Sequence, residues 1–385
     1  MKDKHDLIII GGGILGTFHA FHALKANKSV LQIEKDNFAV GSTVRNFGQV
    51  VPSGMENEWF EYGRVATMLY KQIQSEYDIS VRTNGSLYLA SDDDEVQLLH
   101  ELKGHYDLLD YRSELLTAEM ARQKHPVLNK DYVKEALFFP DEVSVEPHLM
   151  IHKLQEYLKI KFANYSIIYN SPVISCVKNS SRVEVTTTAK NIFTAEKAII
   201  CNGYEFKLLF PELFASSGIV ISKLQMMKTV PMPGISLEGN ILTGLTTRRY
   251  ESFEVHCPSF KSISTPDQYS ELKKWGIHIL FKKAADGSFI IGDSHEYTPV
   301  NNFDALGYDV KQYLNELMLT EAQRIVDFDV RQIQHYWAGF YPQHPEKHIV
   351  SYDIEGCIHI RTAIGGKGMT ASAGYALESI NQLLA

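Results

Sequence analysis

The chain has 385 residues, which is enough for one large or two medium domains with a buried core. Apolar residues make up 44% of it and charged residues 22%, as in an ordinary soluble protein, and a net charge of −8 argues against nucleic acid as a partner. The four cysteines form no C-x-x-C pair, the N-terminal apolar run is too short for a signal peptide, and no stretch has the length of a membrane span, so we expect a reduced, cytoplasmic protein.

The N-terminal stretch has the pattern of a dinucleotide-binding β-α-β unit. After the apolar run Leu7–Ile10, Gly11, Gly13 and Gly16 fit the G-x-G-x-x-G spacing, which permits a tight turn, close approach of a pyrophosphate and packing of a helix on the strand. A second apolar run ends at Glu34, whose carboxylate can bind the ribose hydroxyls and would repel an NADP-type 2′-phosphate. A chance glycine cluster would explain neither the flanking strand and helix nor the acid. This stretch alone leaves FAD and NAD open.

A polar, glycine-rich loop follows over residues 40–54. Its position directly after the β-α-β unit predicts that it runs along the cofactor, with Arg45 and Asn46 donating hydrogen bonds to it. The alternative is a surface loop with an exposed arginine.

The rest of the chain alternates strand and helix patterns. Helices are expected over 59–77, from the acidic start at 91–95, and over 147–162, 309–326 and 371–384. Single strands are expected over 85–90, over 198–203 in the first sheet, and over 357–361. A pair of strands is expected over 136–145 and a small antiparallel element over 167–185. The segment 220–292 should hold several strands, one of them over 240–250, with a hairpin turn at 286–287. His148 and His152 share a helix face, but without a third ligand we expect no metal site.

A second glycine-rich loop, residues 365–370, leads into the C-terminal helix. Such a loop presents backbone N–H groups and the positive end of the helix dipole. Directed at the pyrimidine edge of a flavin, it would stabilise the negative charge of the reduced ring. The alternative is a packing turn without a ligand.

Together these motifs resemble the FAD-dependent oxidoreductases of the D-amino-acid oxidase superfamily, in the glycine oxidase and sarcosine oxidase branch. The matching pieces, spread in order over nearly the whole chain, are GGGILG with Glu34, GSTVRNFG, SPV, AIICNG, WAGFYP and GGKGMT. The resemblance implies an α/β + β fold. A Rossmann-like FAD lobe of the glutathione-reductase type would comprise 1–83, 145–218 and 334–385, and an antiparallel-sheet substrate lobe 84–144 and 219–333.

The resemblance also implies FAD as the cofactor, bound without a covalent link. Sarcosine oxidase-like enzymes attach the flavin through a cysteine in the segment that matches 338–342, and this segment has none. The residues expected to bind FAD are Gly11, Gly13, Ile14, Leu15, Gly16, Glu34, Lys35, Ser42, Thr43, Arg45, Asn46, Phe47, Gly48, Val173, Asn202, Gly203, Gly339, Gly365, Gly366, Lys367, Gly368, Met369 and Thr370.

A phosphonate-associated subgroup of that superfamily is more similar still, on the residues RNFG at 45–48, GDSH at 292–295 with Tyr297, and the segment 250–258. This similarity implies oxidation of the C–N bond of a small amine, in particular an N-methylated 2-aminoethylphosphonate. A hydride would pass to flavin N5, the imine would hydrolyse, and oxygen or another acceptor would reoxidise the flavin. Glycine oxidase-like enzymes clamp the substrate carboxylate with an arginine at the position of Tyr341, so this chain lacks that charged fork.

The residues expected to position the substrate are Tyr341, His295, Lys367, Arg248 and Tyr250. Arg249 and Lys228 are further candidates for binding a phosphonate anion, although either fits a surface charge equally well. Three alternatives stay open: a glycine, sarcosine or D-amino-acid oxidase; a flavin-binding subunit of a larger electron-transfer or RNA-modifying assembly; and an NAD-dependent dehydrogenase, which would leave the GGKGMT loop unexplained.

Overall fold

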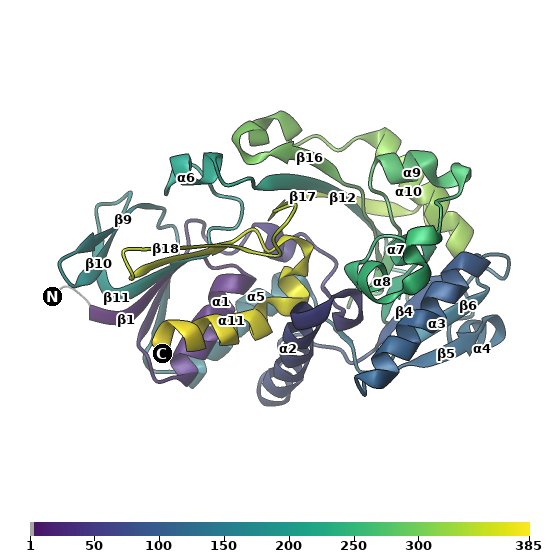
Figure 1. Cartoon of the computed structure of the whole chain (residues 1–385), viewed down its shortest axis with the longest axis horizontal. Coiled ribbons are helices and arrows are strands. Elements are labelled where there is room, and N and C mark those ends of the chain that lie inside the picture. The colour runs from purple at the N-terminus through teal and green to yellow at the C-terminus, as the bar shows by residue number, and fades with distance from the viewer. Residues whose placement is uncertain (1–3) are drawn as a thin grey trace.

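Two β-sheets, each built from distant parts of the chain, organise the protein (Figure 1). The computed structural model describes residues 4–385. The long helix α2 (Asn57–Glu76) lies between the two sheets in both ribbon views. No helix in this described range is long and apolar enough to cross a bilayer.

The first sheet has the order β18-β19-β11-β1-β2-β8 and is parallel except for β18. The hairpin β9-β10 extends it by pairing antiparallel with the first half of β11. The strands are β1 (Lys4–Ile10), β2 (Val30–Ile33), β8 (Tyr165–Ile168), β9 (Val173–Asn179), β10 (Arg182–Thr187), β11 (Ile192–Ile200), β18 (Val350–Ile354) and β19 (Ile358–Thr362).

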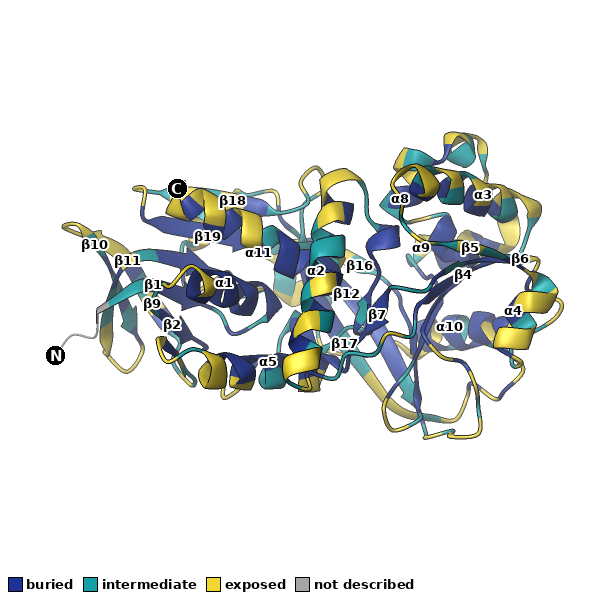
Figure 2. Cartoon of the chain, turned by 90° about the horizontal axis from the view of Figure 1, so that it is seen from below, coloured by how far each residue is buried: buried dark blue, intermediate teal, exposed yellow. Residues whose placement is uncertain are grey.

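The continuous apolar run of β1 reflects burial of both its faces, which Figure 2 shows in dark blue. Ile9 packs with helices α1, α5 and α11 through residues such as Phe18, whereas Ile8 points to the opposite face and packs with the β9-β10 hairpin. The helices of the chain are α1 (Ile14–Lys25), α3 (Asp93–Leu108), α4 (Ala118–Lys124), α5 (Pro147–Lys161), α6 (Pro211–Ala215), α7 (Gly244–Thr247), α8 (Glu251–His256), α9 (Ser270–Lys274), α10 (Gln312–Ile325) and α11 (Gly368–Leu384), besides α2.

The second sheet has the order β16-β12-β15-β14-β13-β4-β6-β5, and β17 pairs with β12. All its pairs are antiparallel except β4 with β13. Ile290 and Ile291 point to opposite faces, where α3 and α10 respectively pack. The strands are β4 (Ser86–Ala90), β5 (Glu114–Thr117), β6 (Glu135–Phe139), β12 (Val220–Thr229), β13 (Asn240–Leu242), β14 (Leu280–Lys283), β15 (Phe289–Gly292), β16 (Glu296–Pro299) and β17 (Ile333–Gln343); β3 (Gln49–Val50) and β7 (Val143–Ser144) form a separate pair.

Two expected elements differ from the structure. The strands expected as a pair over 136–145 do not pair with each other, because β6 joins the second sheet whereas β7 pairs with β3. The strand expected over 240–250 ends at Leu242, because Thr246 and Thr247 donate helical hydrogen bonds to the Thr243 carbonyl and start α7. The expected helices, the parallel return of the chain in β11 and the hairpin turn at Asp286-Gly287 are confirmed.

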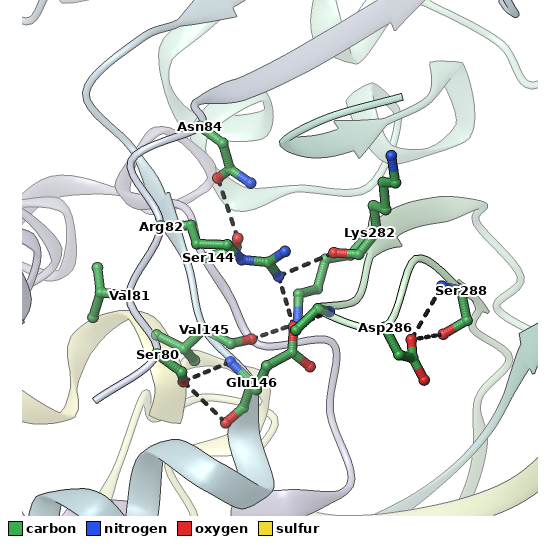
Figure 3. Close-up of polar contacts among 12 residues, drawn as sticks. Ser80, Val81, Arg82, Asn84, Ser144, Val145, Glu146, Lys282, Asp286 and Ser288 are labelled. Carbon is green, nitrogen blue, oxygen red and sulfur yellow. Dashed lines mark hydrogen bonds and ion pairs between the residues drawn. The ribbon is translucent and has the colours of Figure 1, made fainter. Parts of the chain in front are cut away.

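A buried polar cluster joins the start of α5 to β14 (Figure 3). The Glu146 carboxylate accepts hydrogen bonds from Arg82 Nη2 at 2.7 Å and Lys282 Nζ at 3.0 Å, and also from the backbone N–H of Ala285 at 3.0 Å. Lys282 also donates to the Val145 carbonyl, and its side chain is fully buried. Burial lowers the pKa of Lys282 to about 8 against the opposing effect of the Glu146 charge. One oxygen of this carboxylate, Oε1, therefore accepts from donors of three separate segments.

Candidate active site

A first cavity opens at the carboxyl ends of β1, β2 and β11, where ligands of open α/β sheets bind. The residues on its wall that the sequence singled out are Gly11, Gly13, Glu34, Lys35, Ser42, Thr43, Val173, Asn202 and Gly203. The Asn202 side-chain oxygen is buried there without a hydrogen-bond partner among the described residues.

The β1–α1 turn needs its glycines for steric reasons. Gly11 has φ +116°, and a Cβ there would lie 2.1 Å from the Cys201 carbonyl oxygen. A Cβ on Gly16 would lie 2.3 Å from the Gly11 carbonyl oxygen. The N-cap residue Gly13 has no side chain, and the Ile14 N–H donates to the Thr43 hydroxyl at 3.0 Å, so the other N–H groups of the first turn of α1 and the helix dipole face the cavity. This arrangement suits a pyrophosphate.

Glu34 lies at the end of β2 with its carboxylate in the first cavity and only 7% of its surface exposed. Its two oxygens accept hydrogen bonds from the Gly12 N–H at 2.6 Å and the Asp36 N–H at 3.0 Å. Burial raises the pKa of Glu34, and these two backbone bonds oppose that effect. Each oxygen keeps a second lone pair, so the carboxylate can still accept two hydroxyl groups.

In the loop after β2, the side chains of Arg45 and Asn46 form hydrogen bonds with backbone carbonyls of the protein and are not free to bind a ligand. Arg45 donates to the carbonyls of Val40 and Ala338 and lies on neither cavity, and the Asn46 amide donates to the Ser42 and Thr43 carbonyls. The expected hydrogen bonds from the Arg45 and Asn46 side chains to a cofactor therefore do not fit this structure.

A second, larger cavity extends from the first, and both are lined by Gly13, Ser42, Thr43, Cys201 and Gly203. The sequence-predicted residues on its wall are Gly13, Ile14, Leu15, Gly16, Ser42, Thr43, Asn46, Phe47, Gly203, Tyr250, His295, Tyr341, Gly365, Gly366, Lys367, Gly368, Met369 and Thr370. The N-terminus of α11 has no side-chain cap, so two helix N-termini meet one continuous space.

Five predicted positions lie on neither cavity: Arg45, Gly48, Gly339, Arg248 and Lys228. Gly48 and Gly339 serve close packing, because a Cβ on them would lie 2.2 Å from the Val145 carbonyl oxygen and 3.1 Å from the Arg45 carbonyl oxygen respectively. Arg45 is tied to its own loop, as described above. Arg248, expected to position substrate, is instead held by carboxylates from α3 and its N-cap residue, at 2.9 Å from Glu95 and 2.6 Å from Asp92.

The other cationic candidates differ in their availability. Lys228 forms an ion pair with Asp286 at 2.8 Å and lies on neither cavity, and Lys367 contacts Glu251 at 2.5 Å across the second cavity's wall. Arg249 lies on that wall, donates to the Tyr297 hydroxyl at 2.9 Å and has no carboxylate within ion-pair distance in the described part of the chain.

Two tyrosines and an imidazole face the second cavity. Burial, and then the nearby charge of Asp293, raises the pKa of both Tyr341 and Tyr250, so both are neutral phenols at pH 7. Burial lowers the pKa of His295 to about 3 despite the opposing charge of Asp293. His295 is therefore uncharged at neutral pH, so it would position a substrate as a neutral hydrogen-bonding ring, and its place among the substrate residues stays a prediction.

Sequence reasoning missed two cavity residues, Asp293 and His278. Asp293 stands inside the GDSH motif and could have been singled out there, whereas His278 sits in an ordinary apolar run and gave no signal. With His295 they form one of two groups of potential metal ligands in residues 4–385; the other is Glu56, Glu251 and His348. The pair His148 and His152 is in neither group.

The joined cavities fit an elongated dinucleotide with a flavin. Glu34 suits the ribose, the glycine-rich N-terminus of α1 suits the pyrophosphate, and the α11 N-terminus faces the larger space in which an isoalloxazine ring would lie.

Known proteins that are similar to this chain identify its family. Residues 6–379 match the family described as FAD dependent oxidoreductase (DAO). The chain is 27% identical over 222 residues to glycine oxidase of Bacillus licheniformis, covering 55% of this chain and 58% of that protein. It is 24% identical over 211 residues to human mitochondrial dimethylglycine dehydrogenase, covering 53% of this chain and 24% of that protein. The matches thus span little more than half of the curated relatives' length, or less.

Solved structures share the fold across the chain. The structure of L-proline dehydrogenase from P. horikoshii has a TM-score of 0.80 at 18% identity, covering 100% of this chain and 94% of that one. Glycine oxidase from Geobacillus kaustophilus has a TM-score of 0.76 at 16% identity, covering 98% and 95%. These likenesses confirm the predicted fold, a Rossmann-like FAD lobe with a second sheet-based lobe. The chain belongs to the family of FAD-dependent oxidoreductases, and its cofactor is FAD.

Proposed function

We propose that this protein oxidises the C–N bond of a small amine that carries an anionic group, and that an aminoalkylphosphonate, preferably N-methylated, is a better substrate than an amino acid. When bound, FAD would accept a hydride from the carbon next to the substrate nitrogen. The chain's own contribution is to bind, orient and enclose the amine in the second cavity.

The observation that carries the proposal is Tyr341. It forms the cavity wall at the position where the family resemblance implies a carboxylate-binding arginine. A neutral phenol donates one hydrogen bond and cannot form a charged fork with a carboxylate. Arg249, free of ion pairs with the described carboxylates, is the candidate on the same wall for the substrate anion. A single exposed guanidinium suits a tetrahedral anion with several acceptor oxygens as well as a planar one.

The test is anaerobic bleaching of the purified, FAD-bound protein. N-methyl-2-aminoethylphosphonate and 2-aminoethylphosphonate should reduce the flavin faster than sarcosine, glycine and D-alanine at equal concentrations. Faster bleaching by glycine or sarcosine would overturn the phosphonate proposal and support a glycine oxidase-like activity, in keeping with the matched Bacillus proteins. If no amine reduces the flavin, the protein is better described as a flavin-binding subunit.

We also propose that FAD is held without a covalent bond. Residues 338–342 contain no cysteine, and the four cysteines of the chain are all buried. Precipitation with acid should release the yellow colour into the supernatant, and colour that stays in the pellet would contradict the proposal.

A further inference from the structure

One carboxylate on the wall of the second cavity lacks the partners that a buried charge normally has. Asp293 is 6% exposed, directly after β15, and lines the cavity. His278 Nε2 lies 3.0 Å from Asp293 Oδ1, yet the geometry of this contact is not that of a hydrogen bond, and Oδ1 has no donor within the described residues. Burial alone would raise the pKa of Asp293, but the nearby His295, His278 and Arg249 lower it below its usual value, so Asp293 is an anion at neutral pH. A buried anion with an oxygen that no donor reaches can bind a ligand cation strongly.

The side chains around Asp293 supply no positive charge in direct contact. Burial lowers the pKa of His278, so this ring is neutral, and its other nitrogen lies 3.1 Å from the Thr246 hydroxyl. Tyr250 and Tyr341 are neutral phenols. Arg249 acts on Asp293 only through its field and is hydrogen-bonded to Tyr297.

His295 adds a second acceptor beside this carboxylate. Its Nδ1 lies 3.0 Å from the Gly276 carbonyl, which can only accept, so Nδ1 carries the hydrogen and Nε2 of the neutral ring is an acceptor. A ring nitrogen of His295 lies within 4.8 Å of an Asp293 oxygen and of a His278 nitrogen. An anionic acceptor and a neutral acceptor thus lie within the span of one ammonium group.

We propose that Asp293, flanked by His295, is the subsite that receives the amine nitrogen of the substrate. The amine is a cation in water, and its N–H groups would bind the unpartnered carboxylate oxygen and the imidazole acceptor. The anionic end of the substrate would lie toward Arg249. This inference rests on the proposed function for its substrate class, but the binding of an ammonium group to Asp293 can be measured without turnover.

The experiment compares matched ligands on the FAD-bound protein under anaerobic conditions. Isothermal calorimetry and flavin difference spectra give the Kd of 2-aminoethylphosphonate against ethylphosphonate, and of glycine against acetate. For the wild type, the Kd of whichever amine binds more tightly, 2-aminoethylphosphonate or glycine, should be at least about 10-fold below the Kd of the matching ligand without the amino group. In Asp293→Asn that ratio should fall to about 2-fold or less, with the deaminated ligand unaffected. Glu251→Gln is the matched control: this carboxylate lies on the same wall and its Oε2 also lacks a donor among the described residues, but its Oε1 is paired with the Lys367 cation, so the variant should keep the preference.

Other results would overturn the inference. If Asp293→Asn keeps the preference for the amine, or if Glu251→Gln loses it, the amine nitrogen does not bind at Asp293. One equivalent of a divalent metal found by elemental analysis in the wild type and absent from Asp293→Asn would show that the two histidines and the carboxylate hold a metal instead. If Asp293→Asn does not retain FAD, His295→Phe, which removes the neutral acceptor of the subsite, replaces it: the Kd of the amine should rise about 3- to 10-fold while that of its analogue stays constant, and an unchanged Kd would refute the subsite. Failure of every amine to bleach the wild-type flavin refutes the proposed function but not an Asp293-dependent binding preference.

Discussion

Glu146 and Asp293 are both buried carboxylates, with 4% and 6% of their surface exposed, but their surroundings are opposite. Glu146 accepts from two cations and a backbone N–H (Figure 3), and it lines neither of the two cavities described above. Asp293 has a neutral imidazole beside it, an oxygen without a donor, and a cavity in front of it. The partners of the Glu146 carboxylate are all groups of the protein itself, so Glu146 serves the fold. The Asp293 carboxylate lacks such partners and faces a cavity, so its partner is expected to be a ligand.

The comparison predicts that Glu146 matters most for stability. Glu146→Gln removes the negative charge between two cations, so the buried Lys282 must either keep its charge without a partner or give up its proton, and both are unfavourable. The free energy of unfolding should fall by about 3–5 kcal/mol in urea titrations. Glu238→Gln is the control, because its pair with Lys283 at 2.7 Å is half exposed, and the expected loss is about 1 kcal/mol or less. Equal effects of the two substitutions would contradict the distinction.

A third buried carboxyl, Glu142, sharpens the comparison because it has no cation in contact. It is fully buried, accepts from the Ser53 N–H at 2.7 Å and the Tyr111 hydroxyl at 3.1 Å, and burial raises its pKa to about 7. The folded pKa lies above the unfolded one, so the protonated form contributes stability that is fully present below about pH 4.5 and is lost as the pH rises through 7.

The free energy of unfolding should therefore fall between pH 5 and pH 8, with at most about 3 kcal/mol from Glu142. Glu142→Gln, which stays neutral, should flatten that part of the profile. The measurement is urea unfolding at a series of pH values with both proteins. A variant profile that falls as steeply as the wild type would show that other groups cause the dependence.

How well the sequence predicts a site depends on how far apart along the chain the residues of that site lie. The β1–α1–β2 unit was predictable with Glu34 because its parts lie within about thirty residues and each has its own local signal. Arg248 was assigned to the substrate because nothing in its neighbourhood shows that Glu95, 153 positions earlier, would hold it.

Asp293 stands inside the GDSH motif, but its role in the cavity could not be assigned for the same reason. Its surroundings come from β14, β15, α7 and β17, and only the fold brings these together. The absence of a donor on its oxygen is a property of three-dimensional packing, which no motif records. The sequence predicted the fold and the cofactor, whereas the polarity of the substrate cavity needed the structure.

Glu34 combines the two situations: its carboxylate accepts from backbone N–H groups of the protein, as Glu146 does, and it also lines a cavity, as Asp293 does. Glu34→Ala should weaken FAD binding by about 1.5–3 kcal/mol through loss of hydrogen bonds to a charged group. Fluorescence titration of the apoprotein with FAD measures this. Asp36→Ala is the control: this neighbouring carboxylate pairs with Lys35 at 2.7 Å, and its loss should change the Kd about 2-fold or less. An unchanged Kd for Glu34→Ala would mean that Glu34 is not at the ribose.

The smallest expected effect concerns Tyr341, which lies near Asp293 and on which the proposed preference between the two substrate classes rests. Tyr341→Arg places a guanidinium on the cavity wall, where it can pair with a substrate carboxylate, but the Asp293 charge close by competes for it. The ratio of flavin reduction rates should therefore shift toward glycine and away from 2-aminoethylphosphonate by only about 10-fold. Tyr341→Phe, which removes the hydroxyl and adds no charge, should leave the ratio within about 3-fold. Stopped-flow bleaching of both variants with full FAD content measures the ratio directly. A ratio that Tyr341→Arg leaves at the wild-type value would show that the anionic end of the substrate lies away from Tyr341, and the argument for a phosphonate would lose its main support.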